Sequence, residues 1–205
     1  MRSGMLALSV VCALAVASCG RPTFPPYGGE KEIALTAATA ARDLAKVKTL
    51  LAAGANPNKM VKHEGMYQSA WYIALHEMRH TRPESIELVK AMLTGGADPE
   101  AAWGSGVSRG ITRRHDQPPI MMTMLHPEPD VVRGLLAAGL KPQHAQTALV
   151  MAIESGEIEI AHILVEAGTD VNCHPGANTP LLAAIEARNV TLMNYLEEHG
   201  AREKP

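Results

Sequence analysis

Apolar residues recur along this chain at helical spacing, in short segments separated by polar turns. Side chains three and four positions apart lie on one face of a helix, so each such segment predicts a helix with one buried stripe. The clearest stripes are Val47/Leu50/Leu51, Val132/Leu135/Leu136 and Ile160/Ile163/Leu164. A glycine follows each segment, at positions 54, 139 and 168, where a left-handed helix C-cap favours glycine.

The segments also repeat. TALVMAIESGEIEIAHILVEAGTDVN begins at Thr147, and TPLLAAIEARNVTLMNYLEEHGA begins 32 residues later at Thr179. A fixed period in the low thirties is typical of a solenoid, whose units bury their apolar faces against their neighbours. We expect the hydroxyls of Thr147 and Thr179 to cap helix N-termini, with Pro180 in a first turn.

These units resemble ankyrin repeats, whose consensus opens roughly as T-P-L-H-x-A and closes as G-A-D-V-N. Thr179-Pro180-Leu181 matches the opening, and Gly168-Thr169-Asp170-Val171-Asn172 matches the close. The resemblance implies an all-α ankyrin-repeat solenoid of about five helix-turn-helix units over residues 31–201, followed by a tail at 202–205. Counting back from each closing glycine places the repeats near 33–58, 69–99, 118–142, 147–172 and 179–201. Such a fold says little about function by itself.

Two junctions between the units are enlarged, at Lys59–Gln68 and Glu100–Gln117. Long loops inside a compact array are functional or disordered, and Trp, Tyr and Arg dominate interface hot spots. We therefore expect a partner-binding site, with tolerated insertion as the alternative. Its predicted residues are Tyr67, Trp71, Tyr72, Trp103, Arg109, Arg113 and Arg114. The inner-helix face around Tyr72, Met121, Met122 and Met151 is a second candidate surface.

The N-terminal sequence predicts where in the cell the protein is located. Residues 1–18 have the pattern of a secretory leader, because Arg2 precedes an apolar run, 5–16, that is too short to span a bilayer. Val16-Ala17-Ser18-Cys19 resembles the lipobox of bacterial lipoproteins. The resemblance implies cleavage before Cys19, acylation of that cysteine and a tether at 19–30. Gly20 after the cysteine implies, by the same resemblance, the outer membrane and a domain that faces the periplasm. An ordinary secretory signal with a chance cysteine is the alternative.

Composition narrows the choice of partner. The formal net charge is −2 and aromatic residues make up 3% of the chain, which argues against nucleic acid. From Thr147 onward nine acidic residues stand against three basic ones. With Cys12 in the leader and Cys19 acylated, Cys173 is the remaining thiol, so we expect no internal disulfide in the mature chain. That thiol would be reactive only if exposed. We expect a monomer without a cofactor.

One motif favours a different chemistry. His76-Glu77-Met78-Arg79-His80 has the H-E-x-x-H spacing that places two imidazoles on one helix face for zinc, with a glutamate to activate water. Thr81-Arg82-Pro83 stops the helix at once, and no third ligand is marked. We therefore expect no metal site and no enzyme activity, and a zinc hydrolase is the alternative.

The function expected from these features is a lipid-anchored, periplasm-facing module that binds a protein. Small ankyrin lipoproteins of Gram-negative bacteria include immunity proteins that neutralise phospholipase effectors of type VI secretion. That resemblance implies a cognate toxin as the partner here. An envelope scaffold and a stress-protective ankyrin protein are alternatives of the same binding class.

Overall fold

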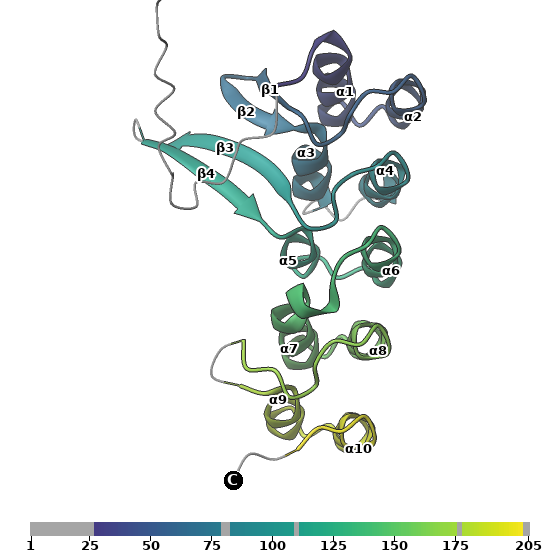
Figure 1. The fold of residues 1–205 in the computed structure, drawn as a ribbon, viewed down its shortest axis with the longest axis vertical. Coiled ribbons are helices and arrows are strands. Elements are labelled where there is room, and N and C mark those ends of the chain that lie inside the picture. The colour runs from purple at the N-terminus through teal and green to yellow at the C-terminus, as the bar shows by residue number, and fades with distance from the viewer. Residues whose placement is uncertain (1–26, 79–82, 109–110, 176–177, 203–205) are drawn as a thin grey trace, which may run out of the picture.

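The structure, a computed structural model, describes residues 27–78, 83–108, 111–175 and 178–202 (Figure 1). For residues 103–108 and 111–117 the structure describes the course of the backbone. The predicted leader, Cys19 and most of the tether lie outside the described residues, and so do Arg79, His80 and Arg109.

Ten helices form five antiparallel pairs in the described part of the chain. They are α1 (Glu30–Ala40) with α2 (Leu44–Ala52), α3 (Ala70–Glu77) with α4 (Pro83–Thr94), α5 (Pro119–Thr123) with α6 (Pro129–Ala137), α7 (Gln146–Ser155) with α8 (Ile158–Glu166), and α9 (Pro180–Glu186) with α10 (Val190–Glu198). The first helices of the pairs stack in an inner column and the second helices in an outer column (Figure 1). The predicted solenoid of about five helix-turn-helix units is confirmed.

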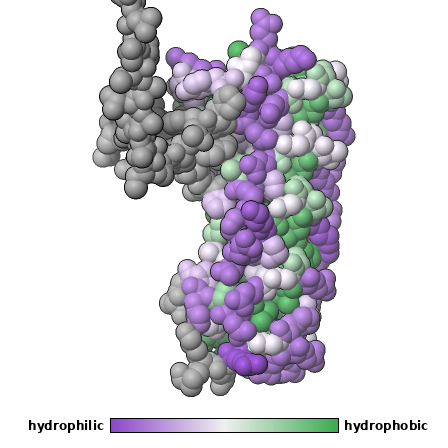
Figure 2. All heavy atoms as spheres, in the orientation of Figure 1, coloured by the Kyte–Doolittle hydropathy of each residue, from purple (hydrophilic) through white to green (hydrophobic). Residues whose placement is uncertain are grey.

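One continuous core runs along the stack between the two columns. Val47, Leu135 and Leu164 of the predicted stripes are fully buried, each on an outer helix. Small residues such as Ala183 and Ala184 are buried on the inner helix α9, where they let neighbouring helices approach closely. In the face shown in Figure 2, hydrophobic residues follow the stack between the columns and hydrophilic residues flank them.

The helix ends follow the sequence signals with one exception. Gly54, Gly96, Gly139, Gly168 and Gly200 all have φ between 83° and 104°, so the predicted left-handed C-caps are confirmed. The Thr179 hydroxyl accepts the backbone N–H of Leu182 at 3.1 Å, as predicted. The predicted cap at Thr147 is wrong. The short 3-10 turn η2 (Pro142–His144) delivers the chain directly into α7, so the N-cap is Ala145 and Thr147 already lies in the first turn.

The two enlarged junctions are β-hairpins that join into one sheet. The first contains β1 (Met60–His63) and β2 (Met66–Ser69), and the second contains β3 (Ala102–Ser108) and β4 (Ile111–Gln117). The sheet is antiparallel throughout in the order β1-β2-β3-β4. It projects from the inner column beside α1 and α3 (Figure 1). The sequence predicted loops at these two junctions, whereas the structure has paired β-strands there.

No helix within the described ranges is long and apolar enough to cross a bilayer.

Candidate partner-binding surface

The sheet brings together residues that the sequence placed in two separate loops. Tyr67 in β2 pairs with Ser105 in β3, and Ser105 pairs in turn with Arg114 in β4. Trp103 pairs with Asp116, two positions further along the second hairpin. Tyr67, Trp103, Arg113 and Arg114 therefore lie at nearby register positions of the four-stranded sheet, here called the platform. Their role in binding a partner stays a prediction.

The platform is fixed to the helices at its base. β2 ends at Ser69, whose side-chain oxygen accepts the N–H of Tyr72 at 3.1 Å and caps α3. The carboxylate of Glu100, just before β3, accepts the N–H of Lys141 at 2.7 Å and pairs with the imidazole of His144. Partial burial acts to raise the pKa of Glu100, and the bonds from His144 and Lys141 outweigh it, so the net pKa is lowered. The second hairpin is thus tied to the junction of the next repeat.

Trp71 lies inside the protein. Its side chain is 0% exposed, and its indole N–H donates to the backbone carbonyl of Asp98 at 2.8 Å. Its backbone N–H donates to the carbonyl of Pro57 at 3.0 Å. This burial corrects the prediction that Trp71 contacts a partner, because no partner can reach the ring. The position matches the buried Leu149 and Leu181 of later repeats, and that alignment was the signal that could have revealed it.

The inner-helix face beside the sheet is a second accessible surface. Tyr72 is half-buried and stacks on His76, with ring centroids 5.9 Å apart. Met121 and Met151 are also partly exposed, whereas Met122 is buried and drops out of the surface that the sequence suggested. A shallow depression of about 190 Å³ opens where α7 meets the junction before α9. Its lining is Thr147, Val150, Met151, Glu154, Pro175 and Asn178.

The C-terminal part of this face is acidic. The side-chain amide of Asn178 donates to Glu154 at 3.0 Å and to Glu186 at 3.2 Å, joining carboxylates of two adjacent repeats. Neither carboxylate forms an ion pair within the described ranges. The inner face therefore changes from aromatic and apolar at α3 and α5 to acidic at α7 and α9.

The described residues of the H-E-x-x-H segment do not form a metal site. α3 ends at Glu77, and the Glu77 carboxylate accepts a hydrogen bond from Arg42 Nε at 2.7 Å. Arg42 lies in the turn between α1 and α2, so Glu77 links the first two repeats instead of facing a free site. His80 lies outside the described residues. Among the residues that are described, no three His, Cys, Asp or Glu side chains gather at metal-binding distance.

Cys173 is buried in the junction that follows α8. Burial, assisted by the nearby Asp170 carboxylate, raises the pKa of its thiol to about 11. At neutral pH the thiol is therefore protonated and shielded, which is the state of a structural cysteine.

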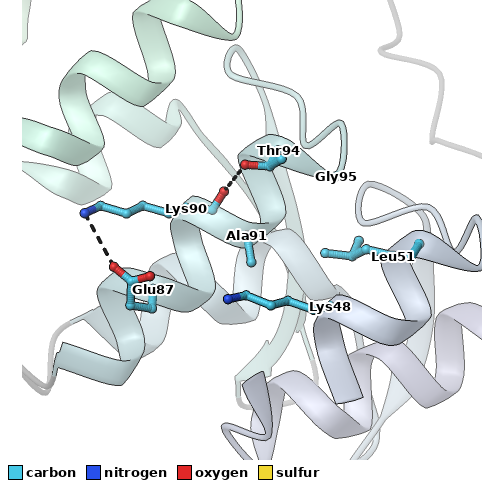
Figure 3. Close-up of a pocket in the computed structure, with 8 residues that line it drawn as sticks. Lys48, Leu51, Glu87, Lys90, Ala91, Thr94 and Gly95 are labelled. Carbon is cyan, nitrogen blue, oxygen red and sulfur yellow. Dashed lines mark hydrogen bonds and ion pairs between the residues drawn. The ribbon is translucent and has the colours of Figure 1, made fainter. Parts of the chain in front are cut away.

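The outer column carries a groove that the sequence did not indicate. It has a volume of about 430 Å³ and lies between α2 and α4 (Figure 3). Gly95 lies at its end, and an added Cβ there would come within 2.8 Å of Leu51. The Lys90 side chain points away from Lys48 and Leu51 (Figure 3); its ammonium pairs with Glu87 at 3.5 Å and with Asp130 on α6 at 3.0 Å. Arg133 continues the series to Glu159 at 2.7 Å on α8, so the charges on this face connect successive repeats.

Residues 120–204 match the family model described as ankyrin repeats (3 copies). The match covers the last three helix pairs, from α5 to α10. No curated protein matches the chain. Ankyrin repeats are in general non-catalytic modules for protein–protein interaction, and the stacked helix pairs with projecting hairpins have the form that such modules use. Residues 120–204 are therefore similar to ankyrin repeats, which indicate a protein–protein interaction module, and the two helix pairs before them continue the same helical solenoid.

Proposed function

We propose that this protein is a lipid-anchored module of the bacterial envelope that faces the periplasm and binds a protein partner. The partner that we propose is an antibacterial effector of the phospholipase type, which the module neutralises by covering it. Such a role needs a large contact surface and no catalytic group of its own. The lipid anchor would be attached at Cys19.

One structural observation carries the proposal. The two inserted hairpins pair through Tyr67–Ser105 and Gln68–Gly104, so insertions from different repeats become one platform beside the inner-helix face. A platform fixed before binding loses less conformational freedom on association than two independent loops would. The aromatic and arginine residues at Tyr67, Trp103, Arg113 and Arg114 are of the types that dominate interface energetics.

Capture and inhibition test the proposal together. Purified protein is immobilised through its C-terminus and incubated with envelope extract from cells that deliver antibacterial effectors. We expect to retain a lipid hydrolase, identified by mass spectrometry, whose cleavage of phospholipid vesicles stops at a one-to-one ratio with the module. A retained partner without hydrolase activity would favour the envelope scaffold instead. Equal inhibition by an unrelated ankyrin domain would refute specific immunity.

Anchoring is tested separately with Cys19→Ala. The variant is expected to lose stable membrane attachment, because acyl chains at that cysteine supply the binding free energy. Cells that produce it should be less protected against the effector than cells with the native chain. Unchanged fractionation with membranes, together with an intact mass that includes the leader, would show that the leader itself is the anchor.

A further inference from the structure

The first described residues are held firmly against β1 and α1. The N–H of Gly28 donates to the carbonyl of Met60 at 3.0 Å, and the N–H of Gly29 donates to Glu32 Oε2 at 2.7 Å. The other oxygen of Glu32 accepts the N–H of Asn56 at 3.1 Å. The bond from Asn56 lowers the pKa of this carboxyl, so it stays ionised at neutral pH and keeps its partners. Any force on the N-terminal segment is therefore transmitted directly to the first repeat and to the sheet.

The position of this attachment limits how far the first repeat can stand from the bilayer. Cys19 precedes Tyr27 by eight residues, which span at most about 29 Å when fully extended. The opposite end of the solenoid is farther away, because four helix-to-helix spacings of about 8–10 Å separate α1 from α9. α1, β1 and β2 lie together at one end of the solenoid (Figure 1), and an acyl anchor at Cys19 would attach the chain to the bilayer at this end.

Three exposed large apolar side chains lie at the same end of the solenoid, and three others, Leu125, Leu182 and Val190, lie in later repeats. Tyr27 is 63% exposed, Ile33 on α1 is 53% exposed and Tyr67 on β2 is 39% exposed. The rings of Tyr27 and Tyr67 pack against each other with centroids 5.2 Å apart. Tyrosine is enriched at membrane–water interfaces, where its ring meets apolar groups and its hydroxyl meets water.

The charge of the solenoid also changes along its length, from basic at the end near the tether to acidic at the C-terminal end. Over residues 27–69 basic side chains outnumber acidic ones, six to four. The basic residues are Lys31, Arg42, Lys46, Lys48, Lys59 and Lys62, and the acidic ones are Glu30, Glu32, Asp43 and Glu64. Arg42 is paired with Glu77 of the second repeat, so the five lysines supply the basic charge of this end. Over residues 147–202 the balance is reversed, with eight acidic residues against Arg188 and Arg202. A field from an anionic bilayer attracts the first region and repels the second.

We infer that the residues Tyr27, Ile33, Lys59 and Lys62 at this end of the solenoid, here called the tether surface, lie against the anionic phospholipid headgroups of the anchoring bilayer. The inference rests on the proposed lipid anchor at Cys19. In this orientation the N-terminal end of the solenoid contacts the membrane and the acidic repeats point away from it. β1 lies toward the tether and β4 forms the other edge of the sheet, so the second hairpin stays available to a partner that works at the lipid surface.

The test uses the lipidated full-length protein in vesicles that contain phosphatidylglycerol. Two exposed β-branched residues serve as matched label sites, Ile33→Cys on α1 and Val190→Cys on α10, each carrying a fluorophore. A quencher attached to the lipid headgroup should quench the label at position 33 strongly and the label at position 190 weakly. Lys59→Glu with Lys62→Glu should remove most of the quenching at position 33. Arg188→Glu with Arg202→Glu changes the net charge equally and should leave it intact.

The outcomes separate the inference from the proposal on which it rests. A protein that carries no lipid and does not associate with vesicles refutes the anchor and the tether surface together. A protein that associates but shows equal quenching at positions 33 and 190 keeps the anchor and overturns the orientation. Equal loss of quenching in both double variants also overturns the inference, since it would show an effect of net charge alone. Thermal unfolding of each variant identifies any loss of fold, and Lys62→Gln then replaces the double substitution.

Discussion

Trp71 offers a sharp test, because the sequence predicts that it contacts a partner, whereas the structure buries it in the core. On a partner-binding surface, Trp71→Ala would lower affinity and leave the fold intact. For a buried Trp71, the same substitution should lower the free energy of unfolding. The ring is fully buried; its indole N–H donates to the Asp98 carbonyl, and the backbone N–H of Trp71 donates to the Pro57 carbonyl of the first repeat.

The magnitude follows from what each substitution removes. Trp71→Ala deletes a fully buried aromatic side chain and leaves a cavity, which typically costs about 3–5 kcal/mol. Trp71→Phe keeps a ring but loses the bond to Asp98, a loss of about 0.5–1.5 kcal/mol, with a smaller packing loss in addition. Whole domains of this kind are stable by about 5–15 kcal/mol, so the alanine substitution removes a large share. Because repeats support their neighbours, α1 and α2 should lose stability with α3.

Urea unfolding, followed by far-ultraviolet circular dichroism, measures these differences. We expect the midpoints to fall in the order native, Trp71→Phe, Trp71→Ala. Tyr67→Ala is the matched control, since Tyr67 is a partly exposed aromatic of the same segment and should change the free energy of unfolding by less than about 1 kcal/mol. An unchanged midpoint for Trp71→Ala, with weakened capture of the partner, would refute the burial and restore Trp71 to the binding surface.

Four further predictions follow from particular contacts. Thr179→Ala should cost about 1 kcal/mol of unfolding free energy, because its hydroxyl caps α9, whereas Thr147→Ala should be close to neutral; equal costs in urea titrations would mean that the helix start of α7 is misplaced. Leu149→Ala and Leu164→Ala, both fully buried, should each cost about 2–5 kcal/mol in the same assay, and neutral results at both sites would contradict the repeat register. Trp103→Ala should weaken partner binding by about 2 kcal/mol at an unchanged melting temperature. Arg113→Glu and Arg114→Glu should slow association most at low salt. If the variant with all three substitutions still protects cells fully, the second hairpin does not bind the partner. The Cys173 thiol, with a pKa of about 11, should react with a disulfide reagent at pH 8 far more slowly in the folded protein than in urea, and rapid labelling of the native state would contradict its burial.

The sequence was informative wherever the signal is local. Gly168 has the positive φ that its place after a helix predicted, and Thr179 caps the helix that its own repeat opens. Both depend on a few neighbouring residues and recur with the period, so each repeat supports the reading of the next. Thr147 does not cap α7 as predicted, because the 3-10 turn at Pro142–His144 starts the helix one residue before it.

The pairing of the two insertions could not be predicted in the same way. β2 and β3 come from segments separated by the whole of α3 and α4, and their contact is defined by two register pairs, Tyr67–Ser105 and Gln68–Gly104. Strand pairing between distant segments leaves no periodic trace in the sequence. Trp71 was misassigned for a related reason: an aromatic residue beside a long insertion resembles a loop residue until its alignment with Leu149 and Leu181 is considered.

The joined sheet has a consequence for how binding free energy would be distributed. Because β2 runs directly into the Ser69 cap of α3, and β3 begins after Glu100 is held by Lys141 and His144, the platform is fixed at two separate repeats. The second hairpin is then oriented partly by β2, which belongs to the first. A substitution that breaks β2–β3 pairing without touching the second hairpin should therefore weaken contacts made by Trp103 or Arg114, since it removes their preorganisation. Two independent loops would show additive effects in a double-mutant cycle, whereas one platform requires a coupling between the hairpins.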